Sequence, residues 1–385
     1  MLQLLFQWLE SLGFDFPGIH LMNYISFKAA LAATLSILTA MVAGKRIISW
    51  LQKKQIGETI RDLGLQGQME KKGTPTMGGI IIILSVLVSV ILVCDITNIY
   101  IILLIITTIW CGALGFTDDY IKVFKHNKEG MSEKGKLVCQ FALGLFIALM
   151  MCFSPLIHTD HIVTTIPFVK AHEFDYSWLS PFSGQAGVYC TWGIYMIMII
   201  FVILACSNGA NLTDGMDGLS TGVSMVVGTV IGIIAWLSGD ILDSKYLNIM
   251  YIPGAGEVAV FMAAFVGALI GFLWYNTFPA QVFMGDTGSL TIGGVIGVSA
   301  VLTRKELLLP ILCGIFLVES LSVLIQRYWF KYTRKKYGEG RRVFLMAPLH
   351  HHFQKKGVPE PRIVTRFIIV GVLLGVSTLA IMKIR

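Results

Sequence analysis

The sequence has few charged residues for its length. Only 14% of its 385 residues are Asp, Glu, Lys or Arg, whereas soluble proteins contain about 25%. Hydrophobic residues make up 55% of the chain. A water-soluble fold of this size could not cover its surface with so few charges, so the composition excludes that class and indicates an integral membrane protein. The net charge of +7 is therefore interpreted as a sign of membrane topology, and no nucleic-acid partner is expected.

The sequence also lacks the signatures of several common protein classes. Its seven cysteines lie inside or at the edges of apolar runs, so they are expected to act as small hydrophobic residues without a disulfide framework. No Walker lysine motif, Gly-x-Ser-x-Gly sequence or His-Glu-x-x-His sequence occurs. Because there is no internal repeat, low-complexity tract or linker, residues 1–385 are expected to form a single polytopic domain.

Apolar runs of about 20 residues, the length that crosses a bilayer as a helix, recur along the chain. They predict an all-α integral membrane protein with about ten transmembrane helices, of which the eighth is short and rich in Gly and Ser. The predicted spans are residues 25–42, 77–94, 99–116, 137–153, 188–206, 219–237, 258–275, 289–302, 307–330 and 364–384.

Lys and Arg are distributed unevenly between the two sides of the predicted bundle. Twelve fall in the loops after the first and third spans and nine in the loop before the last span, whereas the loops on the other side hold six. Because loops rich in Lys and Arg stay in the cytoplasm, both termini are predicted to face outward. The loops that follow odd-numbered spans are predicted to face the cytoplasm.

Two segments outside the spans have predicted structure of their own. Residues 1–20 are apolar but lack the basic start and the cleavage site of a signal peptide, so an interfacial helix is expected. In the long outer segment 154–187, the alternating stretch 161–169 predicts a short β-hairpin outside the bilayer.

Five concentrations of unusual polar residues all lie in predicted cytoplasmic loops. The segment 208–219 has two acids and no Lys or Arg. Asn211, Asp214 and Asp217 step by three and would share one helical face. Acids without a local partner are typical of a divalent-metal site or of a site for a sugar or base donor. The alternative is a capped loop with exposed acids.

The segment 276–289 also has one acid and no basic residue. Asp286 stands between glycines, and Thr287 and Ser289 follow at a predicted helix start. This pattern fits a site for a metal and a phosphate. The alternative is that Asp286 or Thr287 caps the short eighth helix.

Asp118 and Asp119 are adjacent where the third span leaves the membrane. Neighbouring side chains on a helix point about 100° apart, so the two carboxylates can serve different partners. Their place at the interface, just before Lys122, Lys125 and Lys136, favours a functional role over a solvated helix end.

Two further loops are basic. The segment 71–79, from Lys71 to Gly79, combines lysines with a Gly-Thr-Pro turn that could hold an anion, or that simply caps the second span. The segment 347–353 contains three consecutive histidines, which diverge too much to chelate one metal. Beside Arg and Lys they suit phosphate binding, although a solvated basic loop near anionic lipid is the alternative.

Taken together, acids without bases in two loops and bases in three others, all on one side, predict a metal-assisted reaction on a phosphate compound at the inner membrane surface. The motifs resemble the phospho-N-acetylmuramoyl-pentapeptide transferase family of bacterial peptidoglycan synthesis, within the polyprenyl-phosphate hexose-1-phosphate transferase superfamily. The segments that carry the resemblance are GTPTMGG (73–79), DDY (118–120), NLTDGMDGL (211–219), FMGDTGSL (283–290) and APLHHHF (347–353), in the family's order.

The resemblance implies a Mg²⁺-dependent enzyme. Undecaprenyl phosphate would attack the β-phosphate of UDP-N-acetylmuramoyl-pentapeptide, giving UMP and the first lipid-linked precursor of peptidoglycan, lipid I. The resemblance also implies ten membrane helices, a homodimer, and a catalytic cleft on the cytoplasmic face of the bacterial inner membrane.

The family's functional residues carry over onto matching positions. Asp286 would be the principal Mg²⁺ ligand, and Asp118, with Asp119 beside it, would act on the lipid phosphate as a base or as a nucleophile. Direct attack is favoured, because a phosphate monoester is largely ionised at neutral pH. The other catalytic positions would be Lys136, His350, His351 and His352. Residues matching nucleoside-binding positions are Lys71, Gly215, Asp217, Asn276 and Phe283, and further substrate-binding residues are expected at Thr76, Asn211, Leu212, Asp214 and Ser289.

Two other functions are compatible with parts of the sequence. A sister transferase would move N-acetylglucosamine 1-phosphate from its UDP donor to a polyprenyl phosphate, and a panel of UDP-sugars would identify it. A transporter would also place polar groups on broken helices. Its sites should lie near the midplane of the membrane, however, whereas these acids are predicted at one surface.

Overall fold

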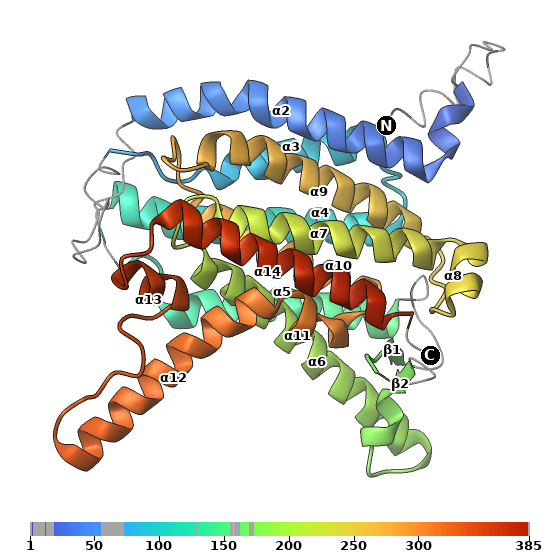
Figure 1. Cartoon of the computed structure of the whole chain (residues 1–385). Coiled ribbons are helices and arrows are strands. Elements are labelled where there is room, and N and C mark those ends of the chain that lie inside the picture. Colours follow the sequence, from blue (N-terminus) through green and yellow to red (C-terminus); the bar gives the residue numbers. More distant parts are fainter. Residues whose placement is uncertain are drawn as a thin grey trace.

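The structure, a computed structural model, describes residues 2, 12, 19–54, 73–125, 127, 129–154, 157, 162–168 and 173–383. Long helices run side by side through most of the molecule (Figure 1). Lys71 lies outside the described residues, and so does nearly all of the predicted interfacial helix at 1–20.

The long helices are α2 (Ile25–Lys53), α3 (Gly79–Val93), α4 (Ile99–Phe124), α5 (Glu133–Phe153), α6 (Gly184–Thr213), α7 (Leu219–Gly239), α9 (Ala255–Asn276), α10 (Gly285–Leu302), α12 (Gly314–Tyr337) and α14 (Glu360–Ile381). The short elements are η1 (Ile19–Asn23), η3 (Tyr176–Leu179), α8 (Ile241–Leu247), η4 (Glu306–Leu308), α11 (Leu309–Leu312) and α13 (Leu349–Lys355), with strands β1 (Val163–Thr165) and β2 (Glu173–Asp175).

Each of the ten predicted spans coincides with helix in the structure. Among the described residues, eight single helices are long and apolar enough to cross a membrane, and α11 and α12 form a bent pair. The second span, α3, is shorter at 15 residues. The all-α, multi-pass membrane architecture is therefore confirmed.

The ninth predicted span, 307–330, is wrong as a continuous helix. The chain bends by 76° between Glu306–Leu312 and Gly314–Tyr337. Pro310 lies in the first turn of α11 and has no N–H to donate, and Cys313 leaves helical geometry at φ −92°, ψ 27°. As a result α12 points away from the other helices (Figure 1).

A short antiparallel strand pair is present in the outer segment as predicted, but only its first strand lies within the stretch 161–169. β1 pairs with β2 in antiparallel register, with Thr164 opposite Phe174, so the partner strand comes from outside the predicted stretch. Strand β1 also contacts the segment that follows α10. The Thr165 N–H and the Thr164 hydroxyl both donate to the Arg304 carbonyl after α10.

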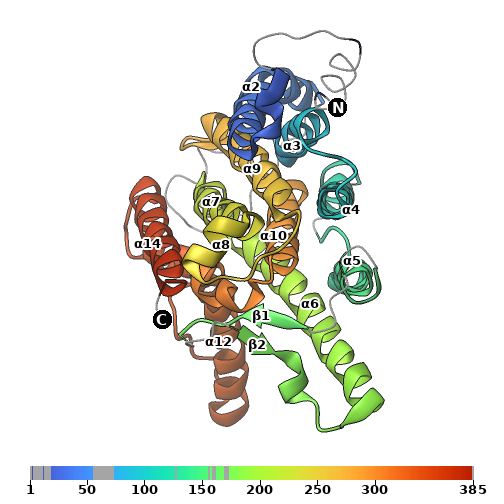
Figure 2. The same ribbon diagram turned by 90° about the vertical axis from the view of Figure 1, so that its right-hand side faces the viewer.

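Helix α10 lies at the centre of the bundle. Figure 2 shows it among the other long helices, with α2, α3 and α9 on one side and α14 on another. In the described structure 89% of its residues are buried, which explains its Gly- and Ser-rich sequence, because small side chains let neighbouring helices approach closely. Helix α2 begins and helix α14 ends toward the same end of the bundle as strands β1 and β2 (Figure 1), and the first turn of α10 lies at the opposite end.

Candidate functional site

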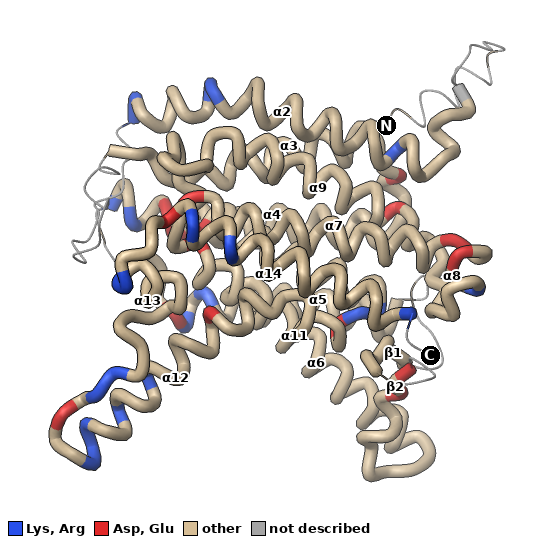
Figure 3. The backbone as a smooth tube through the Cα atoms, in the orientation of Figure 1, with Lys and Arg blue, Asp and Glu red and all other residues tan. Residues whose placement is uncertain are grey.

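Three carboxylates meet where α4 ends and α10 begins. Asp118 and Asp119 lie near the end of α4, and Asp286 lies in the first turn of α10. Ligand oxygens of the three lie within 4.8 Å of one another, and in the described part of the chain no other group of three or more His, Cys, Asp or Glu residues is close enough to share a metal ion. The helices can approach so closely because Gly115 has no side chain; a Cβ there would lie 2.2 Å from the Asp286 carbonyl oxygen. Figure 3 shows the acidic residues at this end of the bundle, with Lys and Arg around them.

Asp119 caps the N-terminus of α10 from a different helix. Its Oδ1 accepts from the Asp286 N–H at 3.1 Å, and its Oδ2 accepts from the Thr287 N–H at 2.9 Å and the Thr287 hydroxyl at 2.7 Å. Helix α10 has no side-chain cap of its own at Met284. The alternative in which Asp286 or Thr287 caps the helix is therefore wrong, and the Asp286 carboxylate stays available for other partners.

Asp118 and Asp286 are joined by two lysines. The Lys122 Nζ lies 2.6 Å from Asp118 Oδ2 and 3.1 Å from Asp286 Oδ2. The Lys136 Nζ lies 2.9 Å and 2.6 Å from the same two oxygens. The Asp118 side chain is fully buried, whereas 33% of the Lys122 side chain and 20% of the Lys136 side chain are exposed. The positive groups thus cover the acids from the open side.

The acidic pair is fixed by further hydrogen bonds. Asp118 Oδ1 accepts from the Met131 N–H at 2.7 Å, which ties the segment before α5 to the site. Asn211 donates to Asp286 Oδ1 at 2.9 Å and to the Ser289 hydroxyl at 2.9 Å. Asn211 and Ser289, both expected site residues, therefore lie in contact with the cluster.

The predicted shared helical face of Asn211, Asp214 and Asp217 is wrong. Helix α6 ends at Thr213, and Asp214 follows at φ −80°, ψ 50°. The chain then turns through Gly218 at φ 77° before α7 begins. Gly218 directly precedes the first residue of α7, and its positive φ is one that glycine adopts readily.

The predicted anion-binding turn at 73–79 pairs with the loop that precedes Asp286. The Gly78 N–H donates to the Phe283 carbonyl at 2.8 Å, the Gly79 N–H to the Met284 carbonyl at 2.9 Å, and the Phe283 N–H to the Pro75 carbonyl at 2.8 Å. Thr76 is buried beside Asp119, since a Cβ at Gly285 would lie within 3.0 Å of both side chains. Two motifs far apart in sequence thus form one layer beneath the cluster.

Asn276 and Asp217 hold the loop between α9 and α10. Asn276 accepts from the Gly218 N–H at 3.1 Å and the Thr221 hydroxyl at 3.0 Å, and donates to the Val282 carbonyl at 3.0 Å. Asp217 accepts from the Ala280 N–H at 3.0 Å. Both side chains are buried, so in the structure they position the loop that carries Phe283.

The three histidines have different hydrogen-bonding partners, but the predicted divergence is only partial, because the ring centroids of His350 and His351 lie 4.2 Å apart. His350 is fully buried, with its Nδ1 3.1 Å from Glu319 Oε2, and a Cβ at Gly215 would lie 2.2 Å from its Nε2. His351 Nδ1 lies 3.2 Å from Gln354 Oε1, and His352 Nδ1 accepts from the Leu345 N–H at 3.1 Å. Partial burial and the nearby Lys356 lower the pKa of His352.

The remaining expected residues are placed around these groups. Leu212, Asp214 and Phe283 are half-buried, and Gly215 is exposed next to His350. Sequence reasoning missed Lys122 as a site residue, although its spacing of four residues from Asp118 was a usable signal. It also missed Glu319, the one acid in the apolar part of α12, where an ionisable residue is a functional candidate by default.

The arrangement offers hard carboxylate oxygens beside partly exposed cationic groups, which suits a divalent cation and phosphate groups together. Comparison with known proteins bears on this chemistry. A family described as glycosyl transferase family 4 matches residues 101–304. A family described as phospho-N-acetylmuramoyl-pentapeptide-transferase signature 1 matches residues 71–83.

Curated relatives match over the full length of both chains. A phospho-N-acetylmuramoyl-pentapeptide-transferase of Parabacteroides distasonis is 51% identical over 421 aligned positions. Proteins of the same name from Flavobacterium psychrophilum and Porphyromonas gingivalis are 51% and 48% identical over 414 and 421 positions, and each alignment covers 100% of this chain and of the relative.

Proposed function

The chain belongs to the phospho-N-acetylmuramoyl-pentapeptide-transferase family, and from this membership we propose that it transfers phospho-N-acetylmuramoyl-pentapeptide from a UDP-linked donor to undecaprenyl phosphate. The products are UMP and lipid I. The observation that carries this proposal is the cluster of Asp118, Asp119 and Asp286 with Lys122 and Lys136. It combines groups that bind a metal with groups that bind phosphate, which is what transfer between two phosphate compounds requires.

The position of the cluster suits the two substrates. One is a lipid and the other is soluble in water, so the site must lie at a membrane surface, and the cluster is at one end of the helix bundle (Figure 3). We place it on the cytoplasmic face of the bacterial inner membrane. The excess of Lys and Arg in the loops at this end supports that orientation.

Mg²⁺ is the proposed cofactor, held by Asp286 with Asp118. The chain's own residues fit it: the carboxylate oxygens are hard ligands within 4.8 Å of one another, and two ammonium groups already bridge the two acids. Bound Mg²⁺ would offset the repulsion between the phosphate groups and stabilise the negative charge on the leaving UMP. Asn211 and the cap by Asp119 would hold the Asp286 carboxylate in place for this ligand role.

Direct attack of the lipid phosphate is the proposed reaction. A lipid phosphate oxygen forms a bond to the β-phosphorus of the donor, and the bond between that phosphorus and the oxygen of UMP breaks. Asp118 receives the remaining proton of the lipid phosphate where one is present. Lys122 and Lys136 are flexible and partly exposed, so they can bind phosphate oxygens when the substrates arrive.

The nucleoside is proposed to bind at Lys71, Gly215, Asp217, Asn276 and Phe283. Asn276 and Asp217 fix the loop that presents Phe283, whose ring would stack on the uracil. The remaining donor contacts are proposed at Thr76, Leu212, Asp214 and Ser289, with His350, His351 and His352 near the diphosphate. Calorimetric titration with the UDP donor tests the assignment: Phe283→Ala should weaken binding, and unchanged affinity in Lys71→Ala, Asp217→Ala and Phe283→Ala would place the pocket elsewhere.

A homodimer is also proposed, by analogy with the family. Light scattering of the purified protein after subtraction of the detergent mass would test it, and a monomer at all concentrations would contradict it.

The decisive experiment follows radiolabel from the muramoyl donor into the lipid fraction, with and without Mg²⁺, while UMP is quantified. Label and UMP should appear in equal amounts and only with a divalent cation. UDP-N-acetylglucosamine serves as the control donor. Transfer from this control donor but not from the muramoyl donor would support the sister reaction, and the absence of UMP release with either donor would contradict a transferase.

A further inference from the structure

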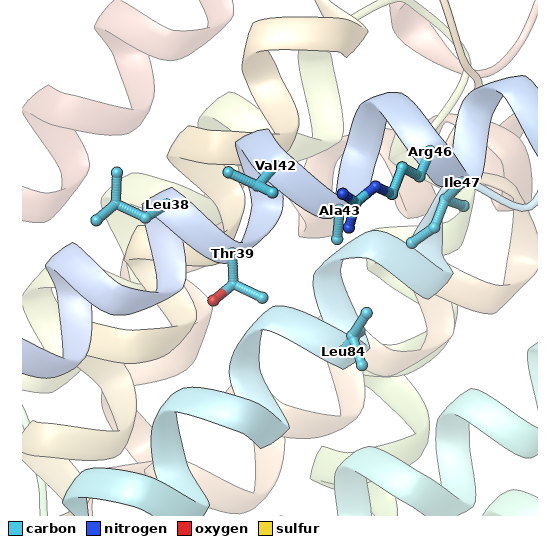
Figure 4. Close-up of a pocket in the computed structure, with 7 residues that line it drawn as sticks. All are labelled: Leu38, Thr39, Val42, Ala43, Arg46, Ile47 and Leu84. Atoms are coloured by element: carbon cyan, nitrogen blue, oxygen red, sulfur yellow. The ribbon is translucent and has the colours of Figure 1, made fainter.

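The outward face of α2 carries an apolar groove that plays no part in the site described above. The groove has a volume of about 480 Å³ and runs between α2 and α3 (Figure 4). Leu38, Val42 and Ile47 of α2 and Leu84 of α3 line it. Leu38 and Val42 are 53% and 61% exposed, so the groove opens toward the lipid that surrounds the bundle.

A second hollow continues from the groove and is basic. It has a volume of about 490 Å³ and is lined by Lys45, Arg46, Ser49, Trp50 and Lys53. Lys45, Ser49 and Lys53 follow one another at helical spacing. Among the described residues no carboxylate forms an ion pair with any of the three cations.

Arg46 joins the two hollows, because it lines both. Its guanidinium turns back along α2 and lies beside Ala43, above the apolar floor (Figure 4). Trp50 is 49% exposed one turn further on, and a Trp in this position is typical of the headgroup level of a membrane. The helix therefore presents an apolar wall, then a cation, then an interfacial aromatic residue. A phospholipid presents its acyl chain, its phosphate and its headgroup region in the same order.

The length of the groove matches one leaflet. Leu38 and Ile47 are nine residues apart, which corresponds to about 14 Å along a helix. This is close to half of the roughly 30 Å hydrocarbon core of a bilayer. A single acyl chain of one leaflet would fill such a groove, whereas an undecaprenyl chain is several times longer.

We propose that the groove between α2 and α3 binds an anionic phospholipid, with an acyl chain against Leu38, Val42 and Leu84 and the phosphate against Arg46, Lys45 and Lys53. The bound lipid lies in the leaflet on the same side as the acidic cluster. This bound lipid is distinct from the lipid substrate, which is proposed to meet Asp118 of α4. The opposite face of α2, with Ala40, Gly44 and Ile48 buried, packs on the bundle and separates the groove from α4.

Native mass spectrometry of the purified protein with added lipids tests this proposal. Phosphatidylglycerol and phosphatidylcholine with identical acyl chains are titrated separately. We expect wild type to bind the anionic lipid more tightly than the neutral one. The triple variant Lys45→Gln, Arg46→Gln, Lys53→Gln should bind the anionic lipid roughly a hundredfold more weakly, since each basic residue near a membrane contributes about 1 kcal/mol.

A matched variant controls for general surface charge. Lys331→Gln, Arg334→Gln, Lys335→Gln removes the same number of charges from the exposed part of α12 and should leave lipid binding unchanged. Ala43→Leu fills the groove without changing charge and should weaken binding of both lipids. Thermal melting verifies that each variant is folded.

Four results would overturn the proposal. An equal loss of lipid binding in the α12 control variant would mean that charge alone attracts the lipid. Unchanged lipid binding in Ala43→Leu would mean that no acyl chain enters the groove. Disulfide crosslinking between two copies of a Val42→Cys variant would mean that a second copy of the protein covers this face. Displacement of phosphatidylglycerol by undecaprenyl phosphate but not by excess cardiolipin would assign the groove to the substrate lipid.

Discussion

Helix α10 has a cluster of buried charged groups at each end, and the two clusters differ in sign and in access. At its first turn, Asp286 meets Asp118 and Asp119 of α4. After its last turn come two cations, Arg304 and Lys305, which are 7% and 3% exposed, and the buried Glu306, which accepts from the Tyr176 hydroxyl. The signs follow the helix dipole, because carboxylates are favoured at a helix N-terminus and cations at its C-terminus.

The cations after the last turn of α10 donate hydrogen bonds to buried side chains. Arg304 Nη1 donates to the Tyr195 hydroxyl at 3.1 Å, and Lys305 Nζ donates to the Thr165 hydroxyl at 2.6 Å. These bonds attach strand β1 and helix α6 to the end of α10. At the first turn, by contrast, the partners of the acids are the partly exposed Lys122 and Lys136.

The difference between the two ends shows what separates a structural charge cluster from a candidate active site. Both ends contain buried ionisable groups with short contacts. Only at the first turn do the cationic partners reach solvent. There the lysines can turn to a phosphate, and the acids that they leave can bind a metal ion. Access to exchangeable partners, and not burial of charge, therefore distinguishes the two.

The largest effect is expected from Asp286→Asn, which should abolish turnover while the protein still folds and inserts. The substitution removes the anionic ligand, whereas the Asn211 contact to Oδ1 can persist. Radiolabel transfer measures turnover, and melting in detergent verifies folding. Rates near those of wild type at saturating Mg²⁺ would contradict the metal-ligand role.

Asp118→Asn tests the mechanism at the same end of α10. If Asp118 receives a proton, the rate should fall by roughly 10²–10⁴, and part of the loss should be recovered at high pH, where the lipid phosphate is fully ionised. If Asp118 is a nucleophile, the variant should be inactive at every pH. A labelled phospho-sugar adduct on Asp118 of wild-type enzyme without lipid would overturn direct attack.

Asp119→Ala should have a smaller, mainly structural effect. It removes the acceptor for the Asp286 and Thr287 N–H groups at the start of α10. Loss of such a cap costs about 0.5–2 kcal/mol, and turnover should fall because Asp286 loses its orientation. The matched control Thr287→Val removes only the hydroxyl contact and should lower the melting temperature less. Equal melting temperatures of wild type and Asp119→Ala would show that the Asp119 cap contributes nothing to stability.

The smallest effect is expected at the closed end, with Lys305→Met. Burial lowers the pKa of Lys305 to about 8, whereas a lysine in an unfolded chain has a pKa of about 10.4. Between these values the unfolded chain binds one more proton than the folded protein, so the contribution of Lys305 to stability rises with pH in that window.

The melting temperature of wild type should therefore increase relative to that of Lys305→Met by a few degrees between about pH 8 and pH 10.4. Turnover at pH 7 should not change, because Lys305 lies at the other end of α10. Lys331→Met on the exposed part of α12 provides the control and should give no pH-dependent difference. If the difference in melting temperature between wild type and Lys305→Met does not change with pH, the lowered pKa of Lys305 is contradicted.

Much of the site was predictable because the relevant signals are local. Asp118 and Asp119 were assigned to different partners from helix geometry alone. The expected divergence of His350, His351 and His352 is only partial, because the first two rings lie in contact in the folded chain. The expectation for Asn211, Asp214 and Asp217 was wrong because periodicity cannot reveal that a helix ends at Thr213. The bend before α12 was missed for a similar reason, since apolar composition continues through Cys313.

The sequence by itself determined the membrane architecture, since each span depends on the hydrophobicity of about 20 consecutive residues. It also determined which polar segments stand at the membrane surface. Only the tertiary structure decided how these segments combine: that Asp119 caps a helix 168 residues further along the chain, and that Lys122 and Lys136 bridge Asp118 to Asp286. Such pairings depend on which helix ends meet in space, and hydrophobic periodicity carries no information about that.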